Sequence, residues 1–222
     1  MFKKTQDICV IGAGRFGSAV IDQLSKMNTS LLLIDKGEEI LKEYADIAQK
    51  VVVADAANMK SLKALNIHEI DTVVVAVADN IEIVAALLEL KVKNIIARAK
   101  TERHARVLNQ IGVNVIIQPE LEAGTRTALI AANQNFIKFS KNLIEVGDDF
   151  VMGTTLLNNP QYDSKAIKDV NFNKFGVSVV LVKRGTQNIL PNGLTMLYKD
   201  DLLTLIGKVQ DVTDVIGELN KQ

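Results

Sequence analysis

Residues 8–17 read Ile8-Cys9-Val10-Ile11-Gly12-Ala13-Gly14-Arg15-Phe16-Gly17, a short apolar run that leads directly into a glycine-rich turn. After Gly17, apolar residues recur every three or four positions, which predicts an amphipathic helix. A second apolar run, residues 31–34, then ends at Asp35. The order strand, glycine turn, helix, strand and acid is the context in which G-x-G-x-x-G indicates a nucleotide-binding site.

Each part of this stretch has a distinct expected role. Gly12 permits a tight turn, Gly14 permits close approach of the backbone to a phosphate, and Gly17 permits close packing of helix on strand. The helix that begins near Arg15 offers free N–H groups and a partial positive charge to an anion. Asp35 is suited to accept both ribose hydroxyls, and its charge repels a 2′-phosphate, so NADP is disfavoured.

The alternation of strand and helix continues along the chain. Further strands are predicted at residues 50–54, 71–77, 94–97 and 113–117, with helices at 38–48, 59–65, 81–90 and 102–110. Six such strands predict an α/β fold, a Rossmann-like, doubly wound parallel sheet.

Ligands of such sheets bind at the carboxyl ends of the strands. The candidate cofactor-binding residues at these ends are Gly12, Ala13, Gly14, Arg15, Phe16, Gly17, Asp35, Lys36, Asp55, Ala56, Ala78, Asn80, Arg98 and Glu120. Among them, Arg15 carries a fixed positive charge whose planar geometry suits a bidentate grip on phosphate.

The pattern changes after residue 142. Short strands with a short helix, which Ser164 is expected to cap, predict a small α+β domain of about eighty residues. A strand at 202–206, ended by Gly207, and a helix at 209–219 complete it. We therefore expect a nucleotide-binding domain at 1–134, a linker at 135–142, and a ligand-binding and dimerisation domain at 143–222. A helix at 121–135 has no further strand to follow, so its apolar face is expected to pack on a partner subunit.

Composition excludes several classes of protein. The chain has 222 residues, 48% of them hydrophobic, and its 26 basic and 26 acidic residues balance, so nucleic acid is not the expected partner. No apolar run approaches the roughly eighteen residues that span a bilayer, and no signal-peptide core is present, which predicts a soluble cytoplasmic chain. Cys9, the single cysteine, is expected to be a small buried residue.

An NAD-dependent oxidoreductase or an NAD(H) sensor remains the alternative, because this fold serves many functions. His68 and His104 are the only histidines, and both are expected on the solvent-facing surface. No catalytic set and no metal-ligand cluster is recognisable, so we expect a protein that is not an enzyme and has no catalytic residues. A repressor would need a DNA-binding element, and no basic helix-turn-helix stretch is present.

The whole chain resembles one family, the cytosolic regulatory subunits of Trk/Ktr-type bacterial potassium uptake systems, built from an RCK N-domain and an RCK C-domain. The motifs that carry the resemblance are residues 10–17, Ile34-Asp35, Ala54-Asp55-Ala56, residues 94–99, Ile111-Gly112-Val113, Pro119-Glu120, Phe175-Gly176-Val177 and Asp200-Asp201-Leu202.

The resemblance implies roles for individual residues. Arg15 would contact the terminal phosphate of ATP or of a subunit-bridging nucleotide, and Asp35 would hold the ribose. Asp55 and Ala56 would border the adenine. Arg98 stands where the family has a basic phosphate contact, and Glu120 where a carboxylate helps to hold a cation (Mg, Na or K).

The resemblance also implies partners. Members form homodimers that assemble into an octameric ring docked on a membrane potassium channel subunit, at the inner face of the cell membrane. ATP favours the open channel and ADP the closed one. In several members cyclic di-AMP binds the C-domain and inactivates uptake; the corresponding residues here are Ile167, Phe172, Val177, Ser178 and Pro191.

Overall fold

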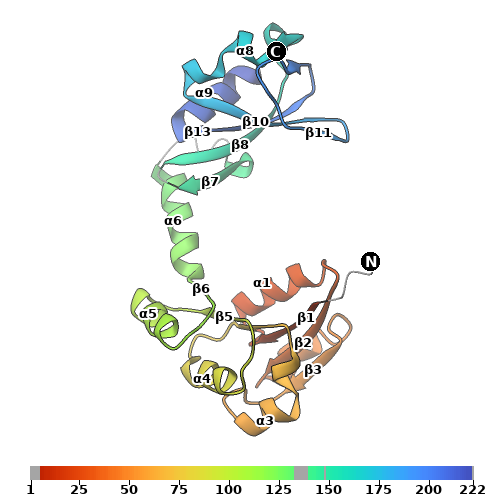
Figure 1. Ribbon diagram of the computed structural model, residues 1–222, viewed down its shortest axis with the longest axis vertical. Coiled ribbons are helices and arrows are strands. Elements are labelled where there is room, and N and C mark those ends of the chain that lie inside the picture. The colour runs from red at the N-terminus through yellow and green to blue at the C-terminus, as the bar shows by residue number, and fades with distance from the viewer. Residues whose placement is uncertain (1–5, 133–139, 148, 222) are drawn as a thin grey trace. The chain divides into compact units, whose positions relative to one another are not determined.

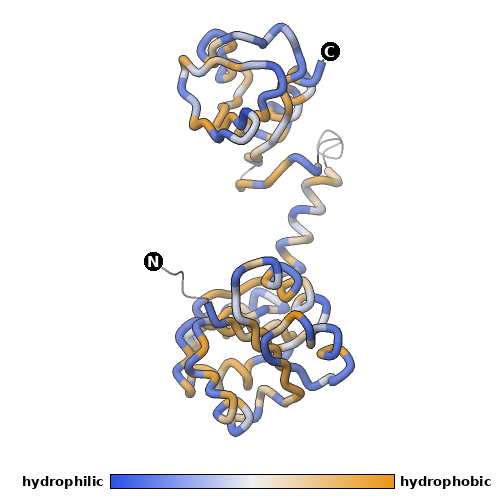
Figure 2. The backbone as a smooth tube through the Cα atoms, turned by 90° about the vertical axis from the view of Figure 1, so that its right-hand side faces the viewer, coloured by the Kyte–Doolittle hydropathy of each residue, from blue (hydrophilic) through white to orange (hydrophobic). Residues whose placement is uncertain are grey.

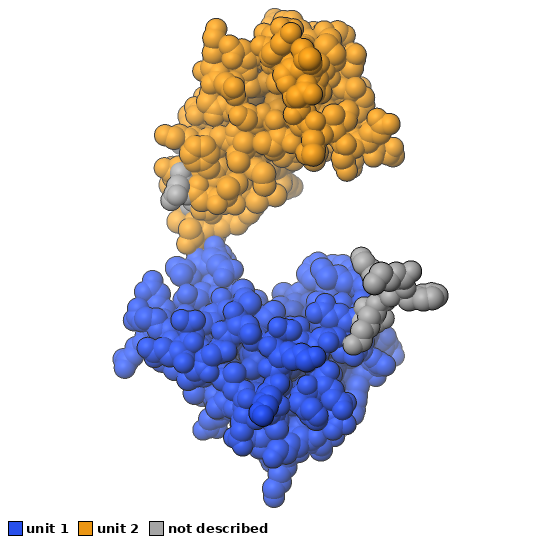
Figure 3. Space-filling view, in the orientation of Figure 1, with its two compact units in different colours: residues 1–123 blue, residues 124–222 orange. Residues whose placement is uncertain are grey.

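The computed structural model describes residues 6–132, 140–147 and 149–221, which form two compact units, residues 1–123 and 124–222 (Figure 3). The boundary between the units falls inside helix α6 (Pro119–Ala132). Most of the predicted linker, residues 135–139, lies outside the described residues, whereas 140–142 form a short 3-10 helix, η2 (Ser140–Asn142). The predicted domain limits therefore stay predictions.

The first unit is built on a six-stranded parallel sheet with strand order β3-β2-β1-β4-β5-β6 (Figure 1), which confirms the predicted doubly wound architecture. Its strands are β1 (Gln6–Ile11), β2 (Thr29–Asp35), β3 (Lys50–Val53), β4 (Thr72–Val75), β5 (Ile95–Arg98) and β6 (Val115–Ile117). Between them lie α1 (Arg15–Leu24), α2 (Glu38–Lys42), α3 (Met59–Ala64), the 3-10 helix η1 (Ile67–Glu69), α4 (Ile81–Glu89) and α5 (Glu102–Gln110).

Both faces of this sheet are buried, because successive side chains of a strand point to opposite faces. In β1, Ile8 and Val10 pack with residues of α1 and α2, whereas Cys9 and Ile11 pack with residues of α3, α4 and α5. Cys9 is fully buried, as predicted, and burial raises the pKa of its thiol far above the usual range. Hydrophobic stretches accordingly run through the strands of the unit (Figure 2).

Two helices of this unit differ from the prediction. Helix α2 ends at Lys42 and does not continue to residue 48, because the chain turns there and buries Tyr44 in the core. Helix α6 begins at Pro119, two residues before its predicted start, and proline is well suited to the first helical position because its missing N–H has no intrahelical partner there. Within the described ranges, no helix is both long and apolar enough to cross a bilayer.

The second unit is built on an antiparallel sheet with strand order β11-β10-β13-β8-β7, and helix α9 (Val209–Leu219) packs on one face. The strands are β7 (Leu143–Gly147), β8 (Phe150–Leu156), β10 (Val177–Arg184), β11 (Gln187–Ile189) and β13 (Leu202–Lys208). A two-stranded ribbon joins β9 (Lys165–Ala166) to β12 (Met196–Leu197), and the short helices are η3 (Pro160–Tyr162), α8 (Ile167–Val170) and η4 (Phe172–Phe175).

Two predictions for this unit are wrong. Ser164 does not cap the short helix: it has φ +57° and precedes β9, and the residue before α8 is Ala166. Gly207 does not end a strand but lies inside β13 opposite Val177. A Cβ there would lie 2.6 Å from the carbonyl oxygen of Gly176, so only glycine lets the two strands approach this closely.

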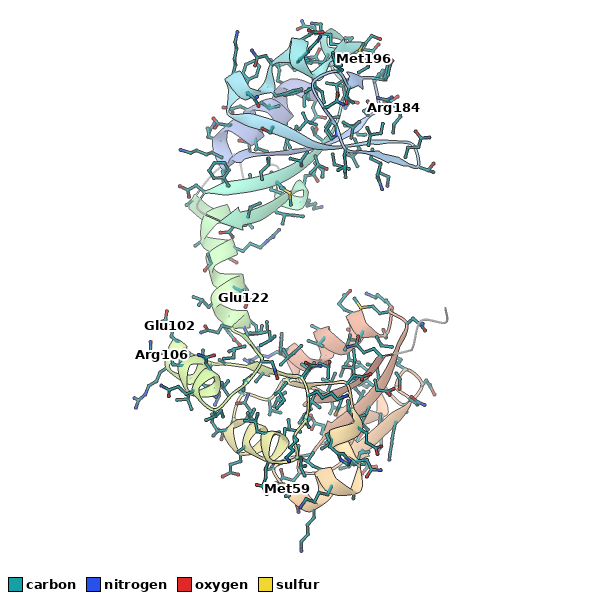
Figure 4. The ribbon with its side chains drawn as sticks, viewed as in Figure 1. Met59, Glu102, Arg106, Glu122, Arg184 and Met196 are labelled. Atoms are coloured by element: carbon teal, nitrogen blue, oxygen red, sulfur yellow. The ribbon has the colours of Figure 1, made fainter. Side chains whose placement is uncertain are left out.

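Arg184, the last residue of β10, connects three strands of this unit. The Arg184 guanidinium donates to both carboxylate oxygens of Asp201, each at 2.8 Å, and to the carbonyl of Met196, also at 2.8 Å (Figure 4). Asp201 is 1% exposed and also accepts from the Tyr198 amide, while the guanidinium stacks on the Tyr198 ring. The contact therefore fastens β12 to β10 and to the start of β13.

The face of the sheet away from α9 is apolar as well. Ile144 pairs with Met152, and Met152 pairs with Ile206, so the three side chains form a row across β7, β8 and β13. Ile144 and Val146 are 58% and 53% exposed. An antiparallel sheet that faces water normally alternates apolar with polar residues, so this face has the composition of a buried one.

Candidate functional site

The turn after β1 is shaped by two glycines. Gly12 has φ +95°, and a Cβ on it would lie 2.5 Å from Cγ1 of Val77. A Cβ on Gly17 would lie 1.8 Å from the carbonyl oxygen of Gly12, so α1 packs directly on the turn. The turn therefore requires glycine at both positions.

Gly14 differs from these two glycines. It is the residue before α1, with φ −67° and ψ −174°, and no heavy atom of the described residues lies within 4 Å of the Cβ that it lacks. No described side chain accepts a hydrogen bond at the start of α1, and its first turn carries no acidic residue. The helix therefore presents free N–H groups and an unneutralised partial positive charge to an open space, which suits an anion.

Asp35 connects this turn to the neighbouring strand. Its Oδ2 accepts from the Ala13 amide at 2.7 Å, and its Oδ1 accepts from the Gly37 amide at 2.8 Å. Each carboxylate oxygen has a second lone pair, so the same side chain can still accept hydrogen bonds from a vicinal diol.

A cavity of about 610 Å³ opens beside these residues at the carboxyl edge of the sheet. Five of the predicted site residues line it: Gly12, Asp35, Lys36, Asp55 and Ala56. Its lining does not include the other nine, Ala13, Gly14, Arg15, Phe16, Gly17, Ala78, Asn80, Arg98 and Glu120. Of these, Phe16 packs against the core and Arg15 is exposed at the start of α1.

The cavity is also lined by residues outside the fourteen candidates. Asp79 and Glu82 line it together with Val77 and Ile81. Asp79 lies in the connection between β4 and α4, and Glu82 is in the first turn of α4. Their position shortly after a strand is the sequence feature that indicates a place at this edge of the sheet. Their carboxylates make this end of the cavity acidic.

An ion pair lines the cavity on the β3 side. Lys36 Nζ lies 2.9 Å from Oδ2 of Asp55, whose other oxygen accepts from the Ala57 amide at 2.9 Å. The hydrogen bond from Lys36, followed by that from Ala57, holds the pKa of Asp55 below its ordinary value. Asp55 is therefore a carboxylate at neutral pH.

A second charged group lies at the other end of the edge, where β5 ends and α6 begins. Arg98 pairs with Glu120, and Asn80, which is 1% exposed, donates from its amide to the carbonyls of Val77 and Arg98 at 3.0 and 2.8 Å. The backbone N–H of Glu120, then Arg98 and the charge of Arg15, lower the pKa of the Glu120 carboxyl. The structure thus brings Arg15, Arg98 and Glu120 into one electrostatic group.

The edge of the sheet is therefore polarised. Asp35 and Asp55, which suit hydroxyl and amine donors, follow β2 and β3, whereas Arg15 and Arg98, which suit phosphate, lie at α1 and β5. Among the described residues, no group of three or more His, Cys, Asp or Glu side chains could by itself hold a metal ion. The donor set fits a nucleotide whose sugar lies over β2 and whose phosphates lie at α1.

The two histidines lie away from this cavity. His68 is exposed on η1, as predicted. His104 is partly buried: its Nε2 is shielded from solvent, and its Nδ1 accepts from the Lys100 amide at 3.3 Å, so the expectation that it is solvent-facing is wrong.

The C-terminal unit has a cavity of about 430 Å³ beside β10. Four of the five residues predicted for a C-domain ligand line it: Ile167, Phe172, Ser178 and Pro191. Val177 does not, since it points into the core and is 1% exposed.

Comparison with known proteins identifies relatives of both units. Residues 8–119 match the TrkA-N domain family, and residues 151–219 match the TrkA-C domain family. The chain is 31% identical over 219 residues to Ktr system potassium uptake protein C of Bacillus subtilis (strain 168), covering 94% of this chain and 95% of the relative. It is 32% identical over 225 residues to Ktr system potassium uptake protein A of Vibrio alginolyticus, covering 97% of this chain and all of the relative (100%).

Solved structures share the fold. The GsuK RCK domain superposes with a TM-score of 0.56 at 17% identity, over 100% of this chain and 49% of that one. The GsuK channel bound to NAD gives 0.55 at 16% identity, over 100% and 40%, and GsuK bound to ADP gives 0.51 at 18%, over 60% and 36%. This chain spans half or less of each GsuK chain.

Proposed function

The chain belongs to the family of proteins built from a TrkA-N and a TrkA-C domain, and on this premise we propose that it is the nucleotide-binding regulatory subunit of a bacterial potassium uptake system of the Ktr type. The proposal gives the chain a gating role and no catalytic residues. Three relatives that the chain covers to 95% or more are Ktr system potassium uptake proteins, which supports that role.

The observation that carries the proposal is the cavity beside the glycine turn. Asp35 lines this cavity and accepts hydrogen bonds from the amides of Ala13 and Gly37. An adenine nucleotide would hold its ribose on Asp35 and its adenine beside Asp55 and Ala56, with its phosphates at the start of α1. The fourteen predicted positions together make up the proposed site. GsuK, which shares the fold, has been solved with NAD and with ADP.

ATP and ADP would be distinguished at the phosphate end. A ligand can shift an equilibrium between two shapes only by its difference in affinity for them. ATP carries one more phosphoryl group than ADP, and Arg15 is an exposed, permanently charged side chain at the anion-binding end of α1. Contact between this guanidinium and the γ-phosphate would supply the difference. Glu120, a carboxylate in the same electrostatic group, would hold a cation (Mg, Na or K) beside the nucleotide.

The proposed assembly uses the second unit. The open apolar face that contains Ile144, Met152 and Ile206 would be buried against a second copy, giving a homodimer. Four such dimers would form an octameric ring, which docks on the membrane-embedded potassium channel subunit at the cytoplasmic face of the cell membrane. The proposed functional division is a nucleotide-binding domain at 1–134, a linker at 135–142 and a C-domain at 143–222.

The cavity beside β10 would be the inhibitory site. It has room for a nucleobase, and Ile167 and Pro191 offer apolar surface, while Ser178 offers a hydroxyl. Cyclic di-AMP is the proposed ligand there, shared between the two copies of the dimer.

Thermal unfolding with ATP, ADP, NAD and NADH, together with the size of the protein in solution, tests the proposal. We expect ATP and ADP each to raise the melting temperature and the chain to elute as a large oligomer. A monomer whose melting temperature responds to neither ATP nor ADP would overturn the gating role. Stabilisation by NADH with turnover of a substrate would favour the oxidoreductase instead.

A further inference from the structure

A second cavity of the C-terminal unit, about 580 Å³, lies between α9 and residues 170–176. Its floor is apolar, because Phe172, Val215 and Leu219 line it and are 3%, 7% and 1% exposed. It is separate from the cavity beside β10, with which it shares Phe172. No role proposed above uses it.

The rim of this cavity is acidic. Asp211, Asp214 and Glu218 lie on α9 at spacings of three and four residues, so they form one stripe about 10 Å long. Asp214 accepts from the neutral amide of Gln210, and no basic side chain in the described part of the chain forms an ion pair with Asp211 or Asp214. The negative charges of Asp211 and Asp214 are therefore not neutralised by an ion pair, whereas Glu218 pairs with Lys221.

The opposite rim offers an aromatic anchor. Phe175, on η4, is 53% exposed, and Lys174 is the one basic residue of the lining. A patch of this kind, with an apolar centre and charges at its border, has the anatomy of a contact surface.

The charges around this cavity indicate which kind of ligand it could bind. Asp211, Asp214 and Glu218 outnumber the single basic residue of the lining, Lys174, so the electrostatics of the cavity favour a cationic occupant. Carboxylates that follow a helix for two turns match a second helix with Lys or Arg at the same spacing and an apolar side chain between them. Loops of membrane proteins on the cytoplasmic side are rich in Lys and Arg.

We propose that this groove between α9 and η4 docks a short basic amphipathic segment of the membrane partner. The inference rests on the proposed function, because it assumes a membrane-embedded partner. Asp211, Asp214 and Glu218 face its basic side chains, and Phe175 covers the apolar residue that enters the groove.

Fluorescence anisotropy with the full-length chain tests the proposal. The probe is a fluorescein-labelled helical peptide of about fourteen Leu and Lys residues, with Leu on one face, and its counterpart carries Glu in place of Lys. We expect binding of the Lys peptide alone. The double variant Asp211→Asn with Asp214→Asn, and separately Phe175→Ser, should each weaken it about tenfold. Asp169→Asn, an exposed carboxylate on α8 outside the groove, is the matched control and should bind like the wild type.

Equal binding of the Lys and Glu peptides, or unchanged affinity in the double variant, overturns the inference. Loss of self-association in the double variant would assign the groove to a second copy and overturn it as well. If the double variant is unfolded, the single change Asp214→Asn at the exposed rim replaces it. The response of the melting temperature to ATP and ADP is measured on the same samples, so failure of docking alone leaves the nucleotide-binding role standing.

Discussion

Asp35 Oδ2 lies 2.7 Å from the amide nitrogen of Ala13, so one carboxylate ties the end of β2 to the glycine turn after β1. Its other oxygen accepts from Gly37 at 2.8 Å, which also fixes the start of the β2–α2 connection. The residue expected to hold the ribose therefore also holds the turn that faces the phosphates. In the proposed site, this one side chain would set the positions of both the sugar and the phosphates.

Asp35→Asn should weaken both the hydrogen bonds that hold the glycine turn and the expected contact with the ribose. The amide has one acceptor where the carboxylate has two, so one backbone N–H loses its partner, at a cost of about 1–2 kcal/mol in the free energy of unfolding. ADP affinity should fall at least tenfold. Urea unfolding and titration calorimetry measure the two effects. Asp22→Asn, on the exposed side of α1, is the control; equal ADP affinity in both variants would contradict the ribose role.

Gly14→Ala and Gly17→Ala should separate binding from folding. The methyl group that Gly17→Ala adds would lie 1.8 Å from a backbone oxygen, so this variant should unfold at a much lower temperature. Gly14 has open space and a conformation that alanine adopts, so Gly14→Ala should keep its melting temperature and lose the stabilisation by ADP. Gly124→Ala, in α6, is the control. A Gly14→Ala chain that still responds fully to ADP would argue against phosphate binding at this turn.

Arg15→Ala should reduce the difference between ATP and ADP. A charge-assisted hydrogen bond to the γ-phosphate contributes about 1.5–3 kcal/mol, so ATP affinity should fall by roughly tenfold to a hundredfold while ADP affinity changes little. Calorimetric titration with both nucleotides checks this, with Arg103→Ala on the exposed face of α5 as the control. Equal losses for the two nucleotides would count against the γ-phosphate contact.

Arg184→Ala should destabilise the C-terminal unit. It leaves the carboxylate of Asp201 buried without its ion-pair partner, at a cost of about 3 kcal/mol, the lower end for such pairs because the arginine is partly exposed. Arg184→Lys should recover only part of this lost stability. Lysine keeps the positive charge but cannot donate to both carboxylate oxygens in one plane. Chemical denaturation of the two variants measures it. An unchanged free energy of unfolding in Arg184→Ala would mean that the contact between Arg184 and Asp201 adds no stability.

Acid should weaken the contact between Arg98 and Glu120. The pKa of Glu120 is lowered in the folded chain, so its contribution to stability is complete above the ordinary value of 4.5 and disappears as pH falls below it. The difference in unfolding free energy between the wild type and Glu120→Gln should therefore be constant near neutral pH and shrink below pH 4.5. Glu102→Gln, next to Arg106 on an exposed helix face (Figure 4), is the matched control. A difference that does not vary with pH would exclude this linkage.

The sequence by itself determined the first unit almost completely. Alternation between strand and helix periods, the glycine turn and the acid after β2 are local signals, because each depends on residues close together in the chain. The six strands, their parallel direction and the burial of Cys9 followed from them. The resemblance to the potassium uptake regulators rested on the same local motifs, and the domain matches confirm it.

Only the tertiary structure decided which distant residues meet. Asp79 and Glu82 join the cavity because β4 pairs with β1 and brings the start of α4 beside the glycine turn. The role of Gly207 depends on how closely β10 approaches β13, and the acidic groove of the second unit is assembled from η3, η4 and α9. Such contacts join residues far apart in sequence, and their geometry depends on the packing of whole strands and helices, which no local pattern records.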